Sequence, residues 1–280
     1  MLEIVAMEIS PLSPTIGAEV RGVDLKQALS DAQRTTLNSA LDEHIVLVIR
    51  DQSLEPDAYV AAMRMFGKPA PQNHSAQLLP GRPEIWRIDS SESVPRHDGQ
   101  RVPVGASCWH TDHTNQQRPP KITALFAVNL PAEGGDTSFA NAYEMFESLS
   151  AESKTEAEAM KTINGADTHV PQREEDAESF RVPAIHPLVH THPRTGRKAL
   201  YVHPLKMQTI EGMSPEESKA FVDRLLDSTI RPEFCYRHKW REGDLVLIDN
   251  RACLHKAERD YDPAVGRVMH RIIIEGDEAA

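Results

Sequence analysis

A histidine and an aspartate two positions apart are the first residues of this chain that could do chemistry together. They are His110 and Asp112, in the segment CWHTD at 108–112. On an extended strand, residues i and i+2 point to the same side, about 6–7 Å apart at the backbone. An imidazole and a carboxylate so placed can reach one metal ion. A second histidine would complete a two-histidine, one-carboxylate set, which holds non-haem iron(II) and leaves positions open for cosubstrate and oxygen.

The pair alone is weak evidence, because a chain with 13 histidines and 42 acidic residues contains such spacings by chance. The alternative is an H-x-D pair at the surface or in a turn. For the second histidine we choose His255, which follows the segment Asp244–Asp249 after a turn. Other histidines compete for the role, each with the alternative of an exposed or hydrogen-bonded imidazole: His113, His169, His186, His190, His192, His203, His238 and His270.

Two arginines near the C-terminus could bind anions. In the predicted strand Arg267–Glu275, Arg267 and Arg271 lie on one face. They are about 13 Å apart along the strand, which indicates two anionic sites at different depths. A guanidinium binds a carboxylate through a planar pair of hydrogen bonds, so arginine suits this task better than lysine. The alternative is a solvent-facing pair of arginines that is balanced by surface acids.

Hydrophobic periodicity and capping residues predict the elements that must position these side chains. The strongest signal is a capping box at Ser214, with Pro215 in the first helical position and Glu217 completing the box. We expect other helices over residues 30–44, 56–66, 142–149 and 151–163. We expect strands over 45–50, 121–129, 244–249 and 267–275, turn chemistry over 133–137, and irregular structure over 68–108. Many short strands with helices on one side favour an antiparallel barrel or jelly roll over a βαβ fold.

Length and charge narrow the function classes. The 280 residues are near the upper end of what one hydrophobic core can organise, so we expect a single domain over 1–280. The net charge of −11 argues against nucleic-acid binding, which rests on phosphate neutralisation by basic residues. It leaves an acidic small molecule open, because a few arginines in a pocket override the global field. The polar segment 165–182 has no clear period, and we expect a mobile loop over the site there.

The cysteines and the N-terminus predict a cytoplasmic protein. The three cysteines form no CxxC pair and no even-numbered framework, which favours a reducing compartment. The first residues lack a charged region followed by an apolar one, so they do not read as a secretory signal. No apolar run approaches the ~18 residues of a membrane span. Met7 is an alternative start to Met1.

These residues lie in sequence blocks that resemble the TauD/TfdA family of Fe(II)/2-oxoglutarate-dependent dioxygenases, which includes taurine and aryloxyalkanoate dioxygenases. The matching blocks run over nearly the whole chain, and their order and spacing together are specific to the family. They include WHTDHT at 109–114, GGDTSFANAYE at 134–144, HPLVHTHPRTGRKALYV at 186–202, GDLVLIDNRACLHKAERDY at 243–261 and RVMHR at 267–271.

The resemblance implies a double-stranded β-helix fold, a cupin-like jelly roll that is mainly β with flanking helices. It implies that His110, Asp112 and His255 ligate iron. It also implies that Thr137 and Arg267 bind the distal carboxylate of 2-oxoglutarate, whose other end chelates the metal.

The resemblance also suggests where the primary substrate binds. Arg271 would lie nearer the substrate, often as the partner of its acidic group. His74 is the candidate for the histidine with which taurine-cleaving relatives reach the sulfonate. Asn115 stands where relatives often have an aromatic residue, which indicates a more polar or roomier pocket. His203, where asparagine is common, is a candidate substrate contact, with a structural histidine as the alternative.

The implied activity consumes 2-oxoglutarate and O2 at Fe(II), releases succinate and CO2, and hydroxylates a small acidic substrate. Fragmentation follows where the hydroxylated carbon bears a sulfonate, an ether or a sulfate ester. We expect no nucleic-acid or membrane partner, and a homodimer or homotetramer. Two alternatives stay open. A zinc hydrolase, or an oxygenase without 2-oxoglutarate, would have no use for Arg267 and Thr137, and a non-catalytic binding protein would have lost a ligand. The sequence does not name the substrate.

Overall fold

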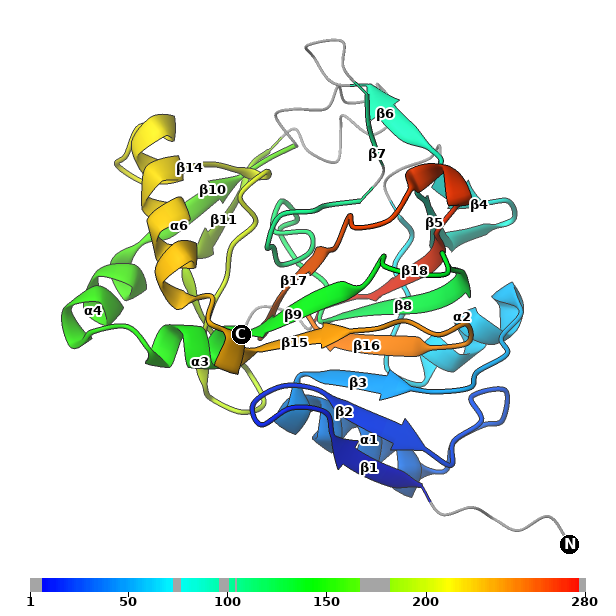
Figure 1. The fold of residues 1–280 in the computed structure, drawn as a ribbon. Coiled ribbons are helices and arrows are strands. Elements are labelled where there is room, and N and C mark those ends of the chain that lie inside the picture. The colour runs from blue at the N-terminus through cyan, green and yellow to red at the C-terminus, as the bar shows by residue number, and fades with distance from the viewer. Residues whose placement is uncertain (1–6, 73–76, 96–100, 104, 167–181, 277–280) are drawn as a thin grey trace, which may run out of the picture.

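An eight-stranded sheet is the largest element of the fold (Figure 1). The computed structural model describes residues 7–72, 77–95, 101–103, 105–166 and 182–276. All neighbouring strands of the large sheet are antiparallel except β2 and β3, which are parallel. In spatial order the sheet contains β1 (Glu8–Pro11), β2 (Ala18–Arg21), β3 (Val46–Ile49), β16 (Leu245–Asp249), β8 (Ile122–Asn129), β18 (Val268–Ile274), β5 (Arg82–Asp89) and β4 (Leu78–Leu79).

The large sheet is buried on both faces, and β3 shows how its sequence achieves this. Side chains alternate across a strand, so Val46 and Val48 join one hydrophobic cluster while Leu47 and Ile49 join another. The second cluster also contains apolar residues of α1 (Asp31–His44) and α2 (Pro56–Arg64). These two helices therefore cover the outer face of the sheet, as the amphipathic pattern predicts.

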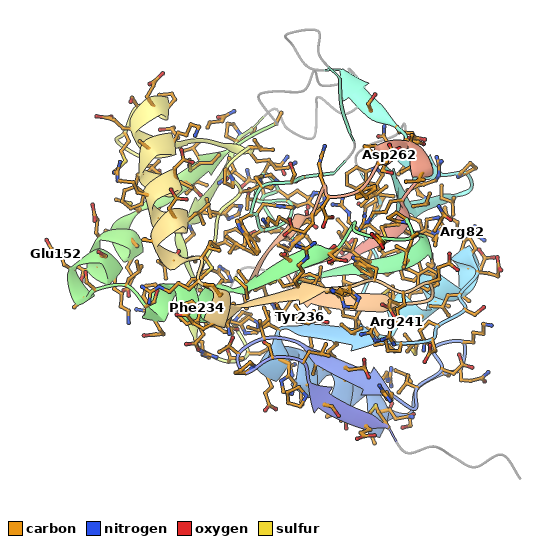
Figure 2. The ribbon with its side chains drawn as sticks, in the orientation of Figure 1. Arg82, Glu152, Phe234, Tyr236, Arg241 and Asp262 are labelled. Atoms are coloured by element: carbon orange, nitrogen blue, oxygen red, sulfur yellow. The ribbon has the colours of Figure 1, made fainter. Side chains whose placement is uncertain are left out.

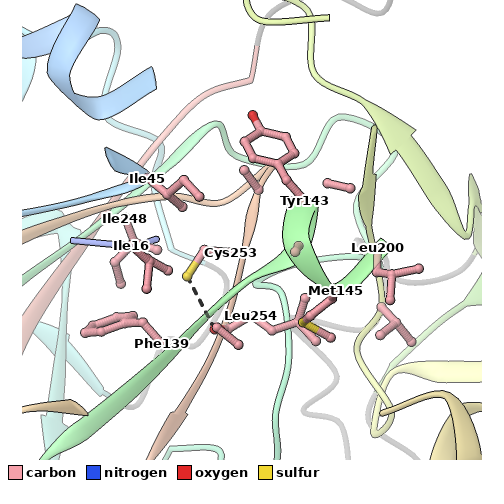
Figure 3. Packing of buried hydrophobic residues seen from close by; sticks show 14 of the residues in the cluster. Ile16, Ile45, Phe139, Tyr143, Met145, Leu200, Ile248, Cys253 and Leu254 are labelled. Atoms are coloured by element: carbon pink, nitrogen blue, oxygen red, sulfur yellow. Dashed lines mark hydrogen bonds between the residues drawn. The ribbon is translucent and has the colours of Figure 1, made fainter. Parts of the chain in front are cut away.

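A second sheet of three strands lies across the inner face of the large one. It consists of β15 (Cys235–His238), β9 (Thr137–Asn141) and β17 (Cys253–Ala257). Phe139 and Leu254 from this sheet pack in the same cluster as Ile248 of the large sheet (Figure 3). Two antiparallel sheets packed around a shared core form the predicted jelly roll, and this prediction is confirmed.

Helices and short strands gather on one side of the molecule, at the left in Figure 1. The helices are α3 (Ala142–Glu147), α4 (Ala151–Ala159) and α6 (Pro215–Thr229), and the capping box before α6 forms as predicted. Charged residues such as Arg82, Glu152 and Asp262 lie at the periphery (Figure 2). The strands on this side are β10 (Lys161–Asn164), β11 (Ala184–Pro187) and β14 (Met207–Ile210). The other short strands are β12 (Val189–Thr191), β13 (Lys198–Leu200), β6 (Ser93–Pro95) and β7 (Arg101–Pro103), of which β6 and β7 lie at the top of Figure 1. Two short 3-10 turns cover Pro232–Phe234 and Pro263–Val265.

Several expected boundaries were wrong. The segment 68–108, expected to be irregular, contains the eight-residue strand β5, which pairs with β18. The helix expected to reach Ile163 ends at Ala159, because the β-branched residues that follow pair with β11 and β14 as β10. Residues 137–141 and 253–257 form strands that the turn-rich sequence concealed. In each case pairing with a distant strand overrides the local signal.

The predicted loop over 165–182 stays a prediction, since residues 167–181 lie outside the described part of the chain. Among the described helices, none is long and apolar enough to cross a membrane.

Candidate active site

Two backbone hydrogen bonds bring the candidate metal ligands together. His110 and His255 face each other in an isolated antiparallel bridge, in which each amide donates to the other residue's carbonyl, at 3.0 and 2.8 Å. Only His110 of segment 108–112 takes part in strand-like pairing, so the expected strand over this segment was wrong. Residues 110 and 112 nevertheless converge, because the chain turns after His110 and places Asp112 against both imidazoles.

The three side chains form a compact buried group. His110 Nε2 lies 3.6 Å from Asp112 Oδ1, and His255 Nε2 lies 3.9 Å from Asp112 Oδ2. One ligand atom from each residue fits within 4.8 Å of the others. The alternative of a surface H-x-D pair is therefore wrong.

Neighbouring polar groups fix the orientation of these side chains. The Nδ1 of His110 lies 2.8 Å from the carbonyl of Cys108. A carbonyl can only accept, so Nδ1 carries the proton and Nε2 presents its lone pair to the centre. Thr123 Oγ1 donates to Asp112 Oδ2 at 2.8 Å. Asn250 accepts from the backbone N–H of Asp112 and donates to its carbonyl, both at 2.9 Å.

The charges at the centre suit a divalent cation. Burial alone would raise the pKa of Asp112, but Arg271 and the histidines outweigh it and hold that pKa well below its usual value. Burial lowers the pKa of His255 to about 3, so its imidazole is neutral at pH 7. A carboxylate with two imidazoles is the donor set that non-haem iron(II) accepts. The residues present therefore fit this metal.

Arg267 and Thr137 form a second, cationic group. Arg267 is only 6% exposed, its Nε donates to the Gly135 carbonyl at 2.8 Å, and its Nη2 approaches Thr137 Oγ1 at 3.4 Å. Within the described residues Arg267 makes no ion pair. Burial accordingly lowers its pKa. A buried cation without a counter-charge is a binding site for an anion. The backbone of Gly135 has φ +72, and an added Cβ would lie 3.0 Å from Arg267 Cδ, so glycine is required here.

Arg271 lies beside the candidate metal ligands. Its Nη1 donates to the two carboxylate oxygens of Asp112 at 3.3 and 3.4 Å, and its Nη2 donates to Gln72 Oε1 at 2.9 Å. The same Nη2 lies 2.9 Å from His113 Nε2, and the guanidinium carbon lies 4.1 Å from the centre of the Trp86 ring. Both arginines are buried, so the alternative of a solvent-facing pair was wrong.

Four neutral polar side chains are buried close to this centre. His203 places its ring 4.7 Å from the ring of His110, and burial lowers its pKa well below the usual value. Neither amide atom of Asn115 finds a hydrogen-bond partner among the described residues, and the same holds for Thr114 Oγ1 and the Tyr201 hydroxyl. Asn115 and His203 are thus buried where the resemblance expects a substrate contact. The other such candidate, His74, lies outside the described residues.

Other histidines that competed for the metal have different partners. The Nε2 of His192 lies 2.9 Å from Asp249 Oδ2, and Nε2 of His238 lies 3.0 Å from Asp244 Oδ2. His192 and Asp249 approach Asp42 closely enough to suggest a second metal group. Arg251 donates to both oxygens of Asp249, so a cation already neutralises this carboxylate. His169 lies outside the described residues.

Sequence reasoning missed several residues of the site. Gln72 accepts from Arg271, and the indole Nε1–H of Trp240 donates to Thr137 Oγ1 at 3.0 Å. Gln72 and Trp240 come from distant segments, and no local pattern marks them. His113 was weighed only as a metal ligand. Its left-handed backbone, with φ 54, accompanies a ring that faces Arg271 instead. The sequence WHTDHT did carry a signal, because histidine is among the few residues besides glycine that adopt this conformation readily.

Comparisons with known proteins give a consistent result. A family model described as taurine catabolism dioxygenase TauD, TfdA family matches residues 8–273. The (S)-phenoxypropionate/alpha-ketoglutarate-dioxygenase of Sphingobium herbicidovorans is 32% identical over 98% of this chain and 97% of its own length. The alkylsulfatase of Acinetobacter baylyi is 31% identical over 97% of this chain and 86% of its own length.

Solved structures give the same answer. The structure of AAD-2 in complex with Mn(II) and N-oxalylglycine superposes with a TM-score of 0.82, at 27% identity over 98% of this chain and 99% of that chain. A taurine dioxygenase from Burkholderia xenovorans superposes with a TM-score of 0.80, at 31% identity over 98% of this chain and 90% of that chain. This chain therefore belongs to the taurine catabolism dioxygenase TauD, TfdA family.

Proposed function

We propose that this protein is an Fe(II)- and 2-oxoglutarate-dependent dioxygenase that hydroxylates a small anionic organic substrate and releases succinate and CO2. One observation carries the proposal: a buried group of two histidines and one aspartate is accompanied by a buried arginine, Arg267, that forms no ion pair among the described residues. The first group suits iron, and the second suits the distal carboxylate of 2-oxoglutarate. A hydrolase that uses only a metal has no need of the second.

Each residue would have a separate task. His110, Asp112 and His255 would hold the metal. When bound, Fe(II) supplies the chemistry that couples O2 reduction to decarboxylation of 2-oxoglutarate and oxidation of a C–H bond. Arg267 and Thr137 would bind the distal carboxylate. The charge-assisted hydrogen bonds of Arg267 would be strong because both side chains are buried.

Arg271 would act on the other side of the metal ligands. Its two terminal nitrogens already bind Asp112 and Gln72, which hold the guanidinium in place. Its Nε–H has no partner among the described residues and can donate to an acidic group of the substrate. The positive charge of Arg271 also keeps Asp112 ionised, as a ligand must be.

The substrate we propose carries a neutral polar group in addition to its acidic one. Relatives are named for phenoxypropionate, 2,4-dichlorophenoxyacetate and sulfate esters, all small anions. In this chain both amide atoms of Asn115, the Tyr201 hydroxyl and His203 Nδ1 are buried and have no hydrogen-bond partner among the described residues. Burying such atoms unpaired costs about 1–3 kcal/mol each, so a ligand that pairs with them gains affinity. If the oxidised carbon bears an oxygen or sulfur substituent, the hydroxylated product fragments.

We further propose a single-domain cytoplasmic enzyme that forms a homodimer or homotetramer. Its three cysteines, Cys108, Cys235 and Cys253, are free thiols, which suits a reducing compartment. Size-exclusion chromatography with light scattering measures the oligomeric state directly.

The test is succinate release from 2-oxoglutarate by the iron-loaded protein, with a panel of small acids. The panel spans sulfonates, alkyl sulfates, aryloxy acids and amino acids, each with and without a hydroxyl or amide group, beside a control without substrate. We expect a compound that carries both groups to stimulate succinate release most. If the iron-loaded protein consumes no 2-oxoglutarate under any condition, the proposed function is wrong.

A further inference from the structure

The hydroxyl of Thr137 lies between two groups that can only donate hydrogen bonds. The indole Nε1–H of Trp240 donates to Thr137 Oγ1 at 3.0 Å, and Arg267 Nη2 approaches the same oxygen at 3.4 Å. A threonine hydroxyl has two acceptor positions and one proton, whereas an indole N–H and a guanidinium accept nothing. Both acceptor positions of Thr137 are therefore used, and its proton must point toward a third group.

That third group is not a residue of the described part of the chain. Thr137 is only 3% exposed, and no described residue accepts its hydroxyl proton. The adjacent Arg267 is a buried cation without an ion-pair partner among the same residues. A hydroxyl proton and a guanidinium side by side complement a carboxylate, which has only acceptors to offer.

Trp240 is itself held firmly enough to impose this direction. It follows β15 and precedes Arg241, which Figure 2 labels at the turn toward β16. Its ring packs edge-to-face against His238, with the ring centres 4.6 Å apart. His238 in turn lies 3.0 Å from the buried carboxylate of Asp244.

We propose that Trp240 is a positioning residue for the cosubstrate. By donating to Thr137, it turns the threonine proton toward the distal carboxylate of 2-oxoglutarate and so favours 2-oxo acids that carry this second carboxylate. The inference rests on the proposed function and deepens it. Trp240 acts through Thr137 and is not a catalytic residue.

The substitution Trp240→Phe tests the role, because phenylalanine keeps an aromatic ring against His238 and lacks the indole N–H. It also shortens the ring that Arg267 faces at 5.8 Å, so the effect must be shown to act through Thr137. The measurement is the dissociation constant of 2-oxoglutarate and of 2-oxopentanoate, by calorimetry on the Mn(II)-loaded protein without oxygen. 2-Oxopentanoate has a methyl group in place of the distal carboxylate. We expect affinity for 2-oxoglutarate to fall about three- to ten-fold, the range of one hydrogen bond to a buried partner. Affinity for 2-oxopentanoate and for Mn(II) should stay unchanged.

A double-substitution cycle separates this role from a structural one. Thr137→Val removes the hydroxyl, so adding Trp240→Phe to it should weaken 2-oxoglutarate binding no further. Thr137→Ser keeps the hydroxyl and should keep the full effect of Trp240→Phe. Additive losses in the valine background, or equal losses for both 2-oxo acids, would overturn the role of Trp240. A wild-type protein that binds the two acids equally would instead overturn the proposed function.

Discussion

At the scale of single residues, the site combines groups whose protonation states are set by burial and by one another. Burial alone opposes the charge of Asp112, but Arg271 and three histidines around it hold its pKa well below the usual value, so it is ionised. Arg267 is buried and has no acidic partner among the residues that the structure describes. A metal cation would bind at Asp112, and a carboxylate of the cosubstrate would bind at Arg267. The site therefore suits two ligands of opposite charge.

Removing the charge of Arg267 should weaken the binding of 2-oxoglutarate and leave the binding of the metal nearly unchanged. In Arg267→Ala we expect the KM for 2-oxoglutarate to rise about 30-fold or more, since a buried ion pair that loses one partner costs roughly 2–5 kcal/mol. Metal affinity should stay within about two-fold of the wild type, because Arg267 does not contact the three ligands. Steady-state kinetics with an equilibrium measurement of metal affinity check both parts. An unchanged KM would remove Arg267 from its proposed role.

At the scale of elements, the strands deliver residues that their own sequences do not mark as related. The continuous apolar, β-branched run of β3 and the capping box of α6 are visible in the sequence, and both elements form as predicted. The pairing of His110 with His255 is not visible, because it depends on how two distant segments align. The place of His255 after the segment Asp244–Asp249 favoured it among nine candidate histidines, and the family resemblance implied the same residue.

The turn before β9 helps to hold Arg267 in place, and it requires glycine at position 135. Gly135 and Gly196 both have a left-handed backbone, with φ +72 and +69, but only Gly135 touches the site. Gly135→Ala should therefore lower 2-oxoglutarate affinity by displacing Arg267, in addition to the ~1 kcal/mol of backbone strain that both positions share.

Gly196→Ala is the matched control, because nothing lies within 4 Å of its added Cβ. It should show a similar loss of stability in urea unfolding and a normal affinity for 2-oxoglutarate. Equal affinities in the two variants would contradict the proposed contact between Gly135 and Arg267.

At the scale of the whole molecule, buried charge networks connect segments that are far apart in the sequence. Asp249, at the end of β16, lies against His192 and Arg251, while Asp244 joins Arg50 and His238 at the other end of the strand. Local patterns predict none of these contacts, because they form only once the sheets have assembled. The strands β5 and β17 escaped prediction for a related reason, because each is defined by pairing with a distant strand. The family resemblance predicted the jelly roll, but it did not predict these strand boundaries.

Asp249 should make the fold sensitive to acid. Burial opposes its charge, but His192 and Arg251 lower its pKa to about 2. A carboxylate with a pKa below its unfolded value near 3.8 stabilises the fold above that value, and the contribution is lost as pH falls from about 4 to 2. This amounts to roughly 2 kcal/mol. In Asp249→Asn, the free energy of unfolding should depend less on pH across this interval, as urea titrations at several pH values would measure. An identical slope in both proteins would contradict this assignment.

The bridge between His110 and His255 has a consequence for how activity emerges during folding. Backbone hydrogen bonds, and not only side chains, hold the two histidines together. Contacts between remote parts of a chain form only after the loops between them have closed. A nascent chain that has not yet paired β17 with its neighbours therefore has only two of the three proposed metal ligands in place, and a fragment that ends before His255 lacks the third. Catalytic competence is in this sense an all-or-none property of the finished chain.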